Sequence, residues 1–523
     1  MTDTVDGERA DQRSAAPEPA TPEWERLDHR TVLVTVLILI GVAVLAGVPT
    51  TVGLTAWRGI GFALAWVLPG AFLMIAVLAG ADELRWRRTR YRVSSDTVEL
   101  HRGILFLSRR RLARARIRAV DTSAHPVMRV FGLTRLTIGT GEQGGGGTDT
   151  ETIVLEPVTR ETGERLRGLL LNRDSSSGTD TNADDTERLA TWRLAWVRYA
   201  PLSIATVIFV GAIVGVPFQV ADWFGRGGLP VEVVRALIER HGVWPVIALG
   251  IPVIVIAAGI ASAALNLEAW WSYRLDREPG GTLRVRRGLL TSRSLTLDEQ
   301  RVRGIDLIEP LGVRLVGAAR VQVVATGLST EAEQKSELST LLPAAPRPLA
   351  LEVAERVCGE APSVPLAGHP VAARGRRLRW ALITVAVLVA GWALLAGLTG
   401  WTTWWSITVG VLVALTTAAL VARALDSYRN LGHALTERHL VTRHGSIRRS
   451  TVLLRRDGII GWQVRQSVFQ RRKGLATLIA TTAAGKGRYA VTDADAGRAL
   501  ELAAEAVPDL IEPFLAASSD SGR

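Results

Sequence analysis

Long apolar segments without charged residues constrain the fold of this 523-residue chain more than any other feature. Such segments cover residues 31–57, 59–81, 199–221, 242–267 and 380–422. A helix needs about 20 apolar residues to cross a bilayer, and the last segment is about twice that length. Within it, GLTGWTTWWS (397–406) offers glycines for a turn and tryptophans for the membrane interface. We therefore predict six transmembrane helices arranged as three hairpins.

A polar block follows each predicted hairpin, and the three blocks align with one another without a gap over some thirty positions. The alignment is anchored on three glycines, Gly103, Gly288 and Gly445. Farther along, it matches three arginines, Arg129, Arg314 and Arg471, and then three more glycines, Gly132, Gly317 and Gly474. A shared register of this kind indicates an internal repeat.

Each block also has the same local pattern of strands and turns. Short alternating runs end on a glycine suited to a turn with positive φ, and a later strand pair leads into a helix, expected at 159–172, 347–359 and 493–507. This order fits a small β-barrel or bent sheet closed by its C-terminal helix. We interpret the matched glycines as backbone requirements. The matched arginines are expected to have a structural partner such as a carbonyl at a corner of the barrel.

The first block reads YRVSSDTVELHRGIL (91–105), continues through ARIRAVD and VFGLTRLTIGTG, and follows a membrane hairpin. It resembles the YdbS-like bacterial PH (pleckstrin-homology-like) domain family, and the triplication resembles the larger YdbT-type members. The third block departs from the pattern, with His433 in place of Tyr91 and Gly458 in place of Arg116. The resemblance implies a half-open barrel with a C-terminal helix, membrane association and no established catalytic residues.

These observations divide the chain into nine segments. They are a disordered tail (1–30), a first hairpin (31–81) and block (90–172), an acidic flexible linker (173–191), a second hairpin (198–267) and block (272–359), a Pro-rich and basic linker (360–379), and a third hairpin (380–423) and block (428–514).

Arginines crowd the block side of every hairpin, as in Arg85, Arg87 and Arg88, whereas the opposite loops carry few charges. The positive-inside rule therefore predicts that all three PH-like blocks and both termini face the cytoplasm of a bacterial cell (inner) membrane. In the loop of the second hairpin, LPVEVVRALIERHG (229–242) predicts a short amphipathic helix on the outer interface.

No motif predicts catalysis, and we expect neither an enzyme nor a cofactor or metal site. Cys358 is the single cysteine, and the histidines are scattered. The Gly-rich segments at 141–148 and 484–488 lack the spacing of a P-loop and are better read as hairpin tips. The predicted spans carry no charged residue, which argues against an ion-coupled transporter.

Twelve arginines and two acids lie between residues 84 and 118, directly after a predicted span. Basic residues so placed can bind an anionic leaflet at about 1 kcal/mol each. The candidates for a lipid-headgroup face are Arg109, Arg110, Arg111, Arg114 and Arg116. The alternative is that these arginines only orient the protein and keep it soluble. Nucleic acid is disfavoured because few aromatic residues stand among them.

The sequence thus favours a non-enzymatic membrane protein that presents three PH-like binding or scaffolding domains. Its expected partners are anionic membrane lipids and another protein, which the family resemblance suggests is a smaller PH-like membrane protein. The alternative is a transporter or lipid-handling protein whose six helices form a path, hinted at by Thr and Ser in GWTTWWSIT (400–408).

Overall fold

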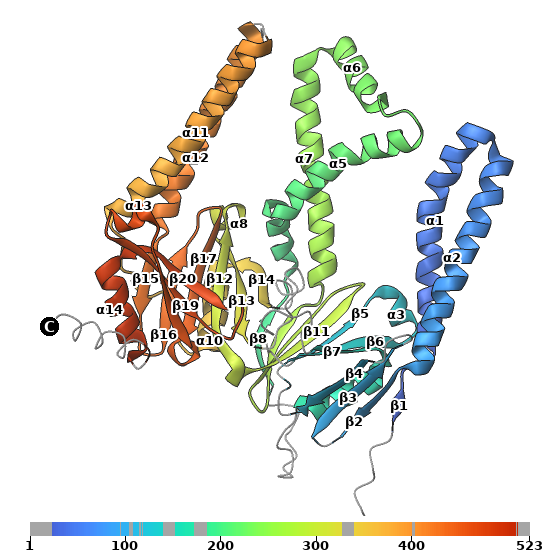
Figure 1. Ribbon diagram of the computed structural model, residues 1–523, viewed down its shortest axis with the longest axis horizontal. Coiled ribbons are helices and arrows are strands. Elements are labelled where there is room, and N and C mark those ends of the chain that lie inside the picture. Colours follow the sequence, from blue (N-terminus) through green and yellow to red (C-terminus); the bar gives the residue numbers. More distant parts are fainter. Residues whose placement is uncertain are drawn as a thin grey trace, which may run out of the picture.

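The computed structural model describes residues 24–94, 96–103, 108–114, 117, 119–139, 152–171, 186–326, 339–399, 403–508 and 510. Within these ranges, six helices are long and apolar enough to cross a membrane, as predicted. They pair as α1 (Arg30–Arg58) with α2 (Ile60–Arg88), α5 (Ile204–Trp223) with α7 (Val243–Trp270), and α11 (Val371–Thr399) with α12 (Thr403–Arg429). All three hairpins extend from the same side of a layer of β-sheets (Figure 1).

The loop between α5 and α7 contains a further short helix, α6 (Leu229–His241). Its first turn holds Pro230, which lacks the N–H that a helix start would leave unpaired. Gly242 joins α6 to α7 with φ +83°, a conformation that L-residues rarely adopt. The helix predicted at 229–242 is therefore present.

The three blocks share one order of elements: three strands, then a strand, a short helix, two strands and a longer helix. We call the first three strands the front half-sheet and the last three the rear half-sheet. The first block contains β2 (Arg90–Val93), β3 (Thr97–Arg102), β4 (Ser108–Ala113), β5 (Ala119–Ala124), α3 (Pro126–Val130), β6 (Leu133–Gly139), β7 (Thr152–Thr159) and α4 (Arg160–Leu171).

The second and third blocks repeat this order. The second contains β9 (Arg274–Glu278), β10 (Thr282–Arg287), β11 (Ser292–Asp298), β12 (Val302–Pro310), α8 (Leu311–Leu315), β13 (Ala318–Ala325), β14 (Thr340–Pro346) and α10 (Arg347–Cys358). The third contains β15 (Gly432–Leu435), β16 (His439–His444), β17 (Arg448–Arg455), β18 (Gly461–Arg465), α13 (Val468–Arg471), β19 (Leu475–Thr481), β20 (Arg488–Asp495) and α14 (Ala496–Ala506).

The sheets do not stay within the blocks. One sheet has the order β7-β6-β5-β11-β10-β9-β8 and joins the rear half of the first block to the front half of the second. Another, β14-β13-β12-β17-β16-β15, joins the second block to the third in the same way. Of the two forms expected for each block, a barrel or a bent sheet, the barrel is not confirmed. None of the described sheets is closed, because β5 and β12 bond the next block's third strand instead of their own.

The two half-sheets of a block still enclose a common core. In the first block, Val98 and Leu112 of the front half pack with Val120 and Leu136 of the rear half. The second core reaches across its boundary and includes Leu453 of the third block. The layer of sheets is thus held by backbone hydrogen bonds and by apolar packing that both cross block boundaries.

Three segments expected to be a disordered tail or linkers contain regular secondary structure. Glu25–Arg26 form β1, which pairs with β2, and Leu27 is buried against the first core. Glu187–Thr191, at the end of the predicted acidic linker, form β8 and pair with β9. The last part of the predicted linker at 360–379 is already helical, because α11 begins at Val371. These expectations are wrong for β1 and β8, because each strand pairs with a neighbouring strand, and for the residues from Val371 onward, because α11 has already begun there.

Candidate functional site: the junctions between blocks

The two junctions between blocks have the same strand register. In the first junction, Ala119 of β5 lies opposite Leu297 of β11. In the second, Gly304 of β12 lies opposite Leu454 of β17. On the alignment anchored at Gly103, Gly288 and Gly445, these are the same two positions of the repeat. The same side-by-side docking therefore occurs twice within one chain.

The six matched glycines all adopt positive φ. Gly103, Gly288 and Gly445 have φ +156°, +108° and +100°, and Gly132, Gly317 and Gly474 have φ between +63° and +69°. At Gly288 a Cβ atom would stand 1.9 Å from the carbonyl oxygen of Thr291. The turn after the second strand therefore requires glycine, for both its dihedral angle and its lack of a side chain.

The matched arginines reach across the junctions. Arg129 on α3 donates to the carbonyl oxygens of Leu289 and Leu290 in the second block. Arg314 on α8 pairs with Asp426 at the end of α12, at 3.0 Å, on the way into the third block. The expected carbonyl partner is thus present for Arg129, whereas Arg314 binds a carboxylate. Arg471 on α13 is exposed, and its side chain has no hydrogen-bond or ion-pair partner within the described part of the chain.

The candidate headgroup arginines do not form a single face. Residues 108–111 are exposed on β4, but successive strand residues point to opposite faces, so Arg109 and Arg111 point away from Arg110. Arg111 pairs with Glu99 at 3.1 Å. Arg114 follows the strand, and Arg116 lies outside the described residues. The register Arg90–His101–Arg109 places Arg109 at the end of β4 nearest to α2.

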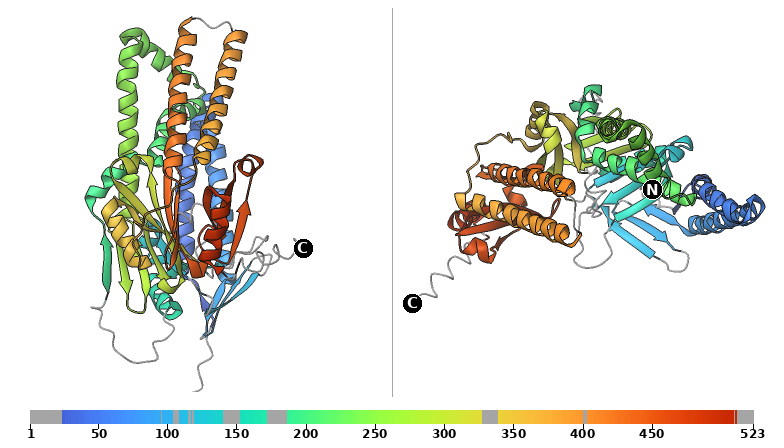
Figure 2. Two further views of the ribbon diagram at one scale, coloured as in Figure 1. Left: turned by 90° about the vertical axis from the view of Figure 1, so that its left-hand side faces the viewer. Right: turned by 90° about the horizontal axis from the view of Figure 1, so that it is seen from above.

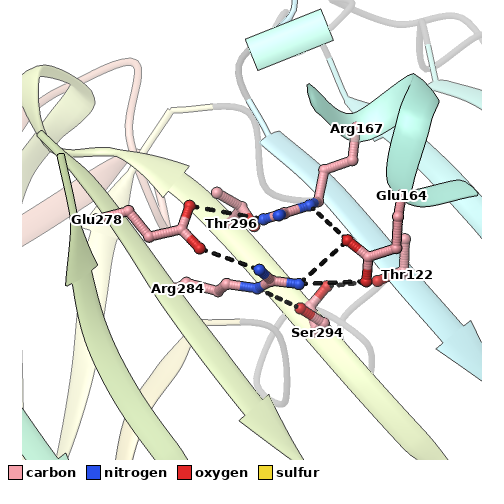
Figure 3. A network of polar contacts seen from close by, with 7 residues as sticks. All are labelled: Thr122, Glu164, Arg167, Glu278, Arg284, Ser294 and Thr296. Carbon is pink, nitrogen blue, oxygen red and sulfur yellow. Dashed lines mark hydrogen bonds and ion pairs between the residues drawn. The ribbon is translucent and has the colours of Figure 1, made fainter. Parts of the chain in front are cut away.

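A polar network lies on one face of the first junction (Figure 3). Arg284 of β10 is 5% exposed and reaches Glu278 at 3.0 Å, Glu164 of α4 at 3.3 Å and the Ser294 hydroxyl at 3.2 Å. Arg167 of α4 joins the same two carboxylates and the hydroxyl of Thr296. The helix that ends the first block is thereby fixed to the front half-sheet of the second.

A cavity of about 500 Å³ adjoins this network and ends at Trp271 and Ser272, directly after α7. Its charged lining residues are seven arginines and one carboxylate: Arg129, Arg160, Arg274, Arg284, Arg286, Arg287, Arg293 and Glu164. Arg160, Arg274 and Arg286 are exposed, with no side-chain hydrogen bond or ion pair to any described residue. The cavity therefore concentrates positive charge at the membrane-facing end of a sheet.

Burial, together with the excess of positive charge, lowers the pKa of two arginines that line the cavity. Burial, followed by repulsion from Arg293, lowers the pKa of Arg287 to about 10. Burial, followed by repulsion from Arg284, also lowers the pKa of Arg286. Both guanidinium groups remain charged at neutral pH, at an electrostatic cost that a bound anion would reduce. A second cavity, of about 380 Å³, shares Arg287 and Arg293 and extends to the base of α5 and α7.

The second junction pairs one buried carboxylate with two arginines, and we call this arrangement the balanced junction. Glu309 of β12 is 2% exposed and accepts two hydrogen bonds from Arg449 of β17, each 2.7 Å, and one from Arg347 at 3.1 Å. In the first junction, the aligned positions hold Ala124 and Ser292. The first junction therefore lacks the acid that neutralises arginine in the second.

The arginine-lined cavity was missed by sequence reasoning because its walls come from two blocks. The available signal was RVRRG (284–288), which carries three arginines immediately before the matched Gly288. Nothing in that segment indicates that α3 and α4 of the preceding block supply Arg129, Arg160 and Glu164 to the same cavity.

Comparison with known proteins agrees with the repeated architecture. The UPF0699 transmembrane protein YdbT of Bacillus subtilis (strain 168) is 23% identical over 283 residues, which cover 51% of this chain and 55% of that relative. The chain therefore spans about half the length of the curated relative that it matches. No solved structure is significantly similar. The profile of the bacterial PH domain matches residues 32–174 and 376–506, together more than half of the chain. The chain belongs to the bacterial PH domain family.

Proposed function

We propose that this protein is a non-enzymatic scaffold of the bacterial cell membrane whose blocks lie on the cytoplasmic surface and bind anionic lipid. The cavity between the first and second blocks carries the proposal, because seven arginines face one carboxylate there. It ends where α7 ends, which is where the headgroups of a surrounding bilayer would lie. A lipid phosphate would supply the negative charge that Glu309 supplies in the second junction.

The arrangement of the hairpins supports a scaffold over a transport path. The two helices of each hairpin pack against one another, and α5 approaches α1. Otherwise the hairpins stand apart in the view from above (Figure 2). A path through six helices would need them to surround a common axis. The shared sheets instead hold three separate anchors at fixed positions.

Lipid binding by the full-length chain tests this proposal. The purified protein, in a neutral detergent, is titrated with phosphatidylglycerol or phosphatidylcholine, and bound lipid is counted by native mass spectrometry. The wild type should retain phosphatidylglycerol selectively. Arg274→Ala/Arg286→Ala removes two arginines of the cavity whose side chains pair with no described residue. It should weaken that binding about thirtyfold, from roughly 1 kcal/mol for each.

The matched control is Arg438→Ala/Arg488→Ala, which removes the same charge from exposed positions of the third block. It should bind phosphatidylglycerol as the wild type does. Equal binding by the cavity variant and the control would refute the assignment of the cavity to anionic lipid.

A further inference from the structure

The array of blocks ends in two unpaired strand edges. At the junctions, β5 and β12 bond the third strand of the next block, β11 or β17. In the third block the corresponding strand is β18, which pairs only with β19. In the first block the strand corresponding to β11 and β17 is β4, which pairs only with β3. Within the described residues, each end of the array therefore exposes the edge of one of the two strands that form a junction.

The register of the two internal junctions predicts how these halves would fit. Transferring it places Gly461 opposite Leu112, and the pairing then runs antiparallel to Arg465 opposite Ser108. No arginine would then face another arginine. Arg109 would face Val464, Arg110 would face Gln463, and Arg111 would lie beside Trp462, an arrangement that favours cation–π contact.

The free end of the third block keeps features that serve the internal junctions. Arg471 matches Arg129, which binds the next block, and Arg314, which binds Asp426 on the helix leading into the next block. Arg471 is exposed, and its side chain has no partner among the described residues. Val464 is 47% exposed, whereas the matching Leu307 is 2% exposed inside the second junction.

We propose that β18 of one copy pairs with β4 of a second copy of this chain, in the register of the internal junctions. An exposed strand edge is a template for such pairing, and both copies would keep their hairpins on the same side, as successive blocks do here (Figure 1). The contact is head-to-tail, because it joins two different surfaces. Repetition of a head-to-tail contact gives a ring if the rotation closes and a row if it does not.

Cross-linking between differently tagged chains tests the pairing directly. One chain carries Gln463→Cys and the other Arg110→Cys, both with Cys358→Ser, and they are reconstituted together in vesicles of phosphatidylcholine and phosphatidylglycerol. Directly opposed cross-strand residues have Cβ atoms about 4.5–5.5 Å apart, close to the span of a disulfide. Mild oxidation should therefore give a band that contains both tags.

Leu500→Cys on α14 replaces Gln463→Cys in the control, because it is another exposed position of the third block. It should give no band containing both tags. Absence of that band with Gln463→Cys, or an equal yield with Leu500→Cys, would overturn the proposal.

A second measurement uses Arg471→Ala, which removes no described contact from the single chain. Mass photometry of the chain in nanodiscs large enough for several copies should show multimers of the wild type. The fraction of multimers should fall at least severalfold for Arg471→Ala and stay unchanged for its exposed neighbour in Arg472→Ala. A wild type that stays monomeric, or a loss as large with Arg472→Ala, would also count against head-to-tail pairing.

Discussion

The two junctions between blocks share a backbone register but differ in how they handle charge. In the second junction, the buried Glu309 is matched by Arg449 and Arg347. In the first junction, Ala124 occupies the position of that acid, and arginines line a cavity. The backbone register is the same in both junctions although the side chains that cross them differ. The side chains at a junction can therefore differ, so one junction holds a buried acid paired with arginines while the other holds an arginine-lined cavity.

The largest effect is expected from breaking the balanced junction. Glu309→Ala leaves Arg449, which is largely buried, without its carboxylate, and removing one partner of a buried pair costs about 3–5 kcal/mol. The midpoint of thermal unfolding in detergent should fall accordingly. Glu352→Ala is the control, because its pair with Arg356 lies on the exposed side of one helix and contributes below about 0.5 kcal/mol. Equal midpoints for the two variants would contradict the importance of a balanced junction.

An intermediate effect is expected at Asp121, the one acid that faces the arginines from β5. Its Oδ1 is enclosed without a hydrogen bond, and burial raises the pKa of Asp121 to about 6, although Arg293 and Arg287 oppose this shift. The pKa of this carboxyl group is higher in the folded than in the unfolded chain. Its favourable contribution to the free energy of unfolding is therefore fully present below about pH 4 and is lost as pH rises through 6. The stability of Asp121→Asn relative to the wild type should therefore increase between pH 4 and 6.

The gain should approach about 3 kcal/mol at neutral pH, which is the energy that corresponds to raising the pKa of this carboxyl group from 3.8 to about 6. It is measured as the difference in the free energy of unfolding between variant and wild type across that pH range. A constant difference would show that the Asp121 carboxyl titrates normally.

The smallest effect is expected from Glu164→Gln in the first junction. Glu164 is about half exposed, so solvent screens its pair with Arg284, and Glu278 remains as a second partner. The cost should be about 0.5–1 kcal/mol at low salt and should shrink at high salt, as measured by unfolding in both conditions. A loss of stability as large as that of Glu309→Ala would contradict the distinction between a junction with a buried acid pair and a junction with a half-exposed one.

Local and periodic features of the fold were predictable from the sequence. Uncharged apolar segments predicted the six spans, and the common spacing after Gly103, Gly288 and Gly445 predicted the repeat, because both can be read along the sequence without knowing which strands pair. The positive φ at these glycines followed from their place at the end of a strand.

The pairing of β5 with β11 could not be predicted in this way. The alternation of apolar and polar residues shows that Val120 faces a core. The same alternation is compatible with pairing of β5 to the third strand of its own block or to the third strand of the next block. The arginine-lined cavity was hidden for the same reason, since it exists only when α4 lies over β10. The strands β1 and β8 are short and polar and gave no periodic signal.

The strands shared between blocks also have a mechanical consequence. Three blocks joined by flexible linkers would let each hairpin tilt independently. Strands bonded across the boundaries instead restrict the motion of one block relative to the next. Hinging at the first boundary would require breaking the pairing of β5 with β11 along its length. If the hairpins span a bilayer, a tilt imposed on one of them is therefore transmitted through the shared sheets to the other two.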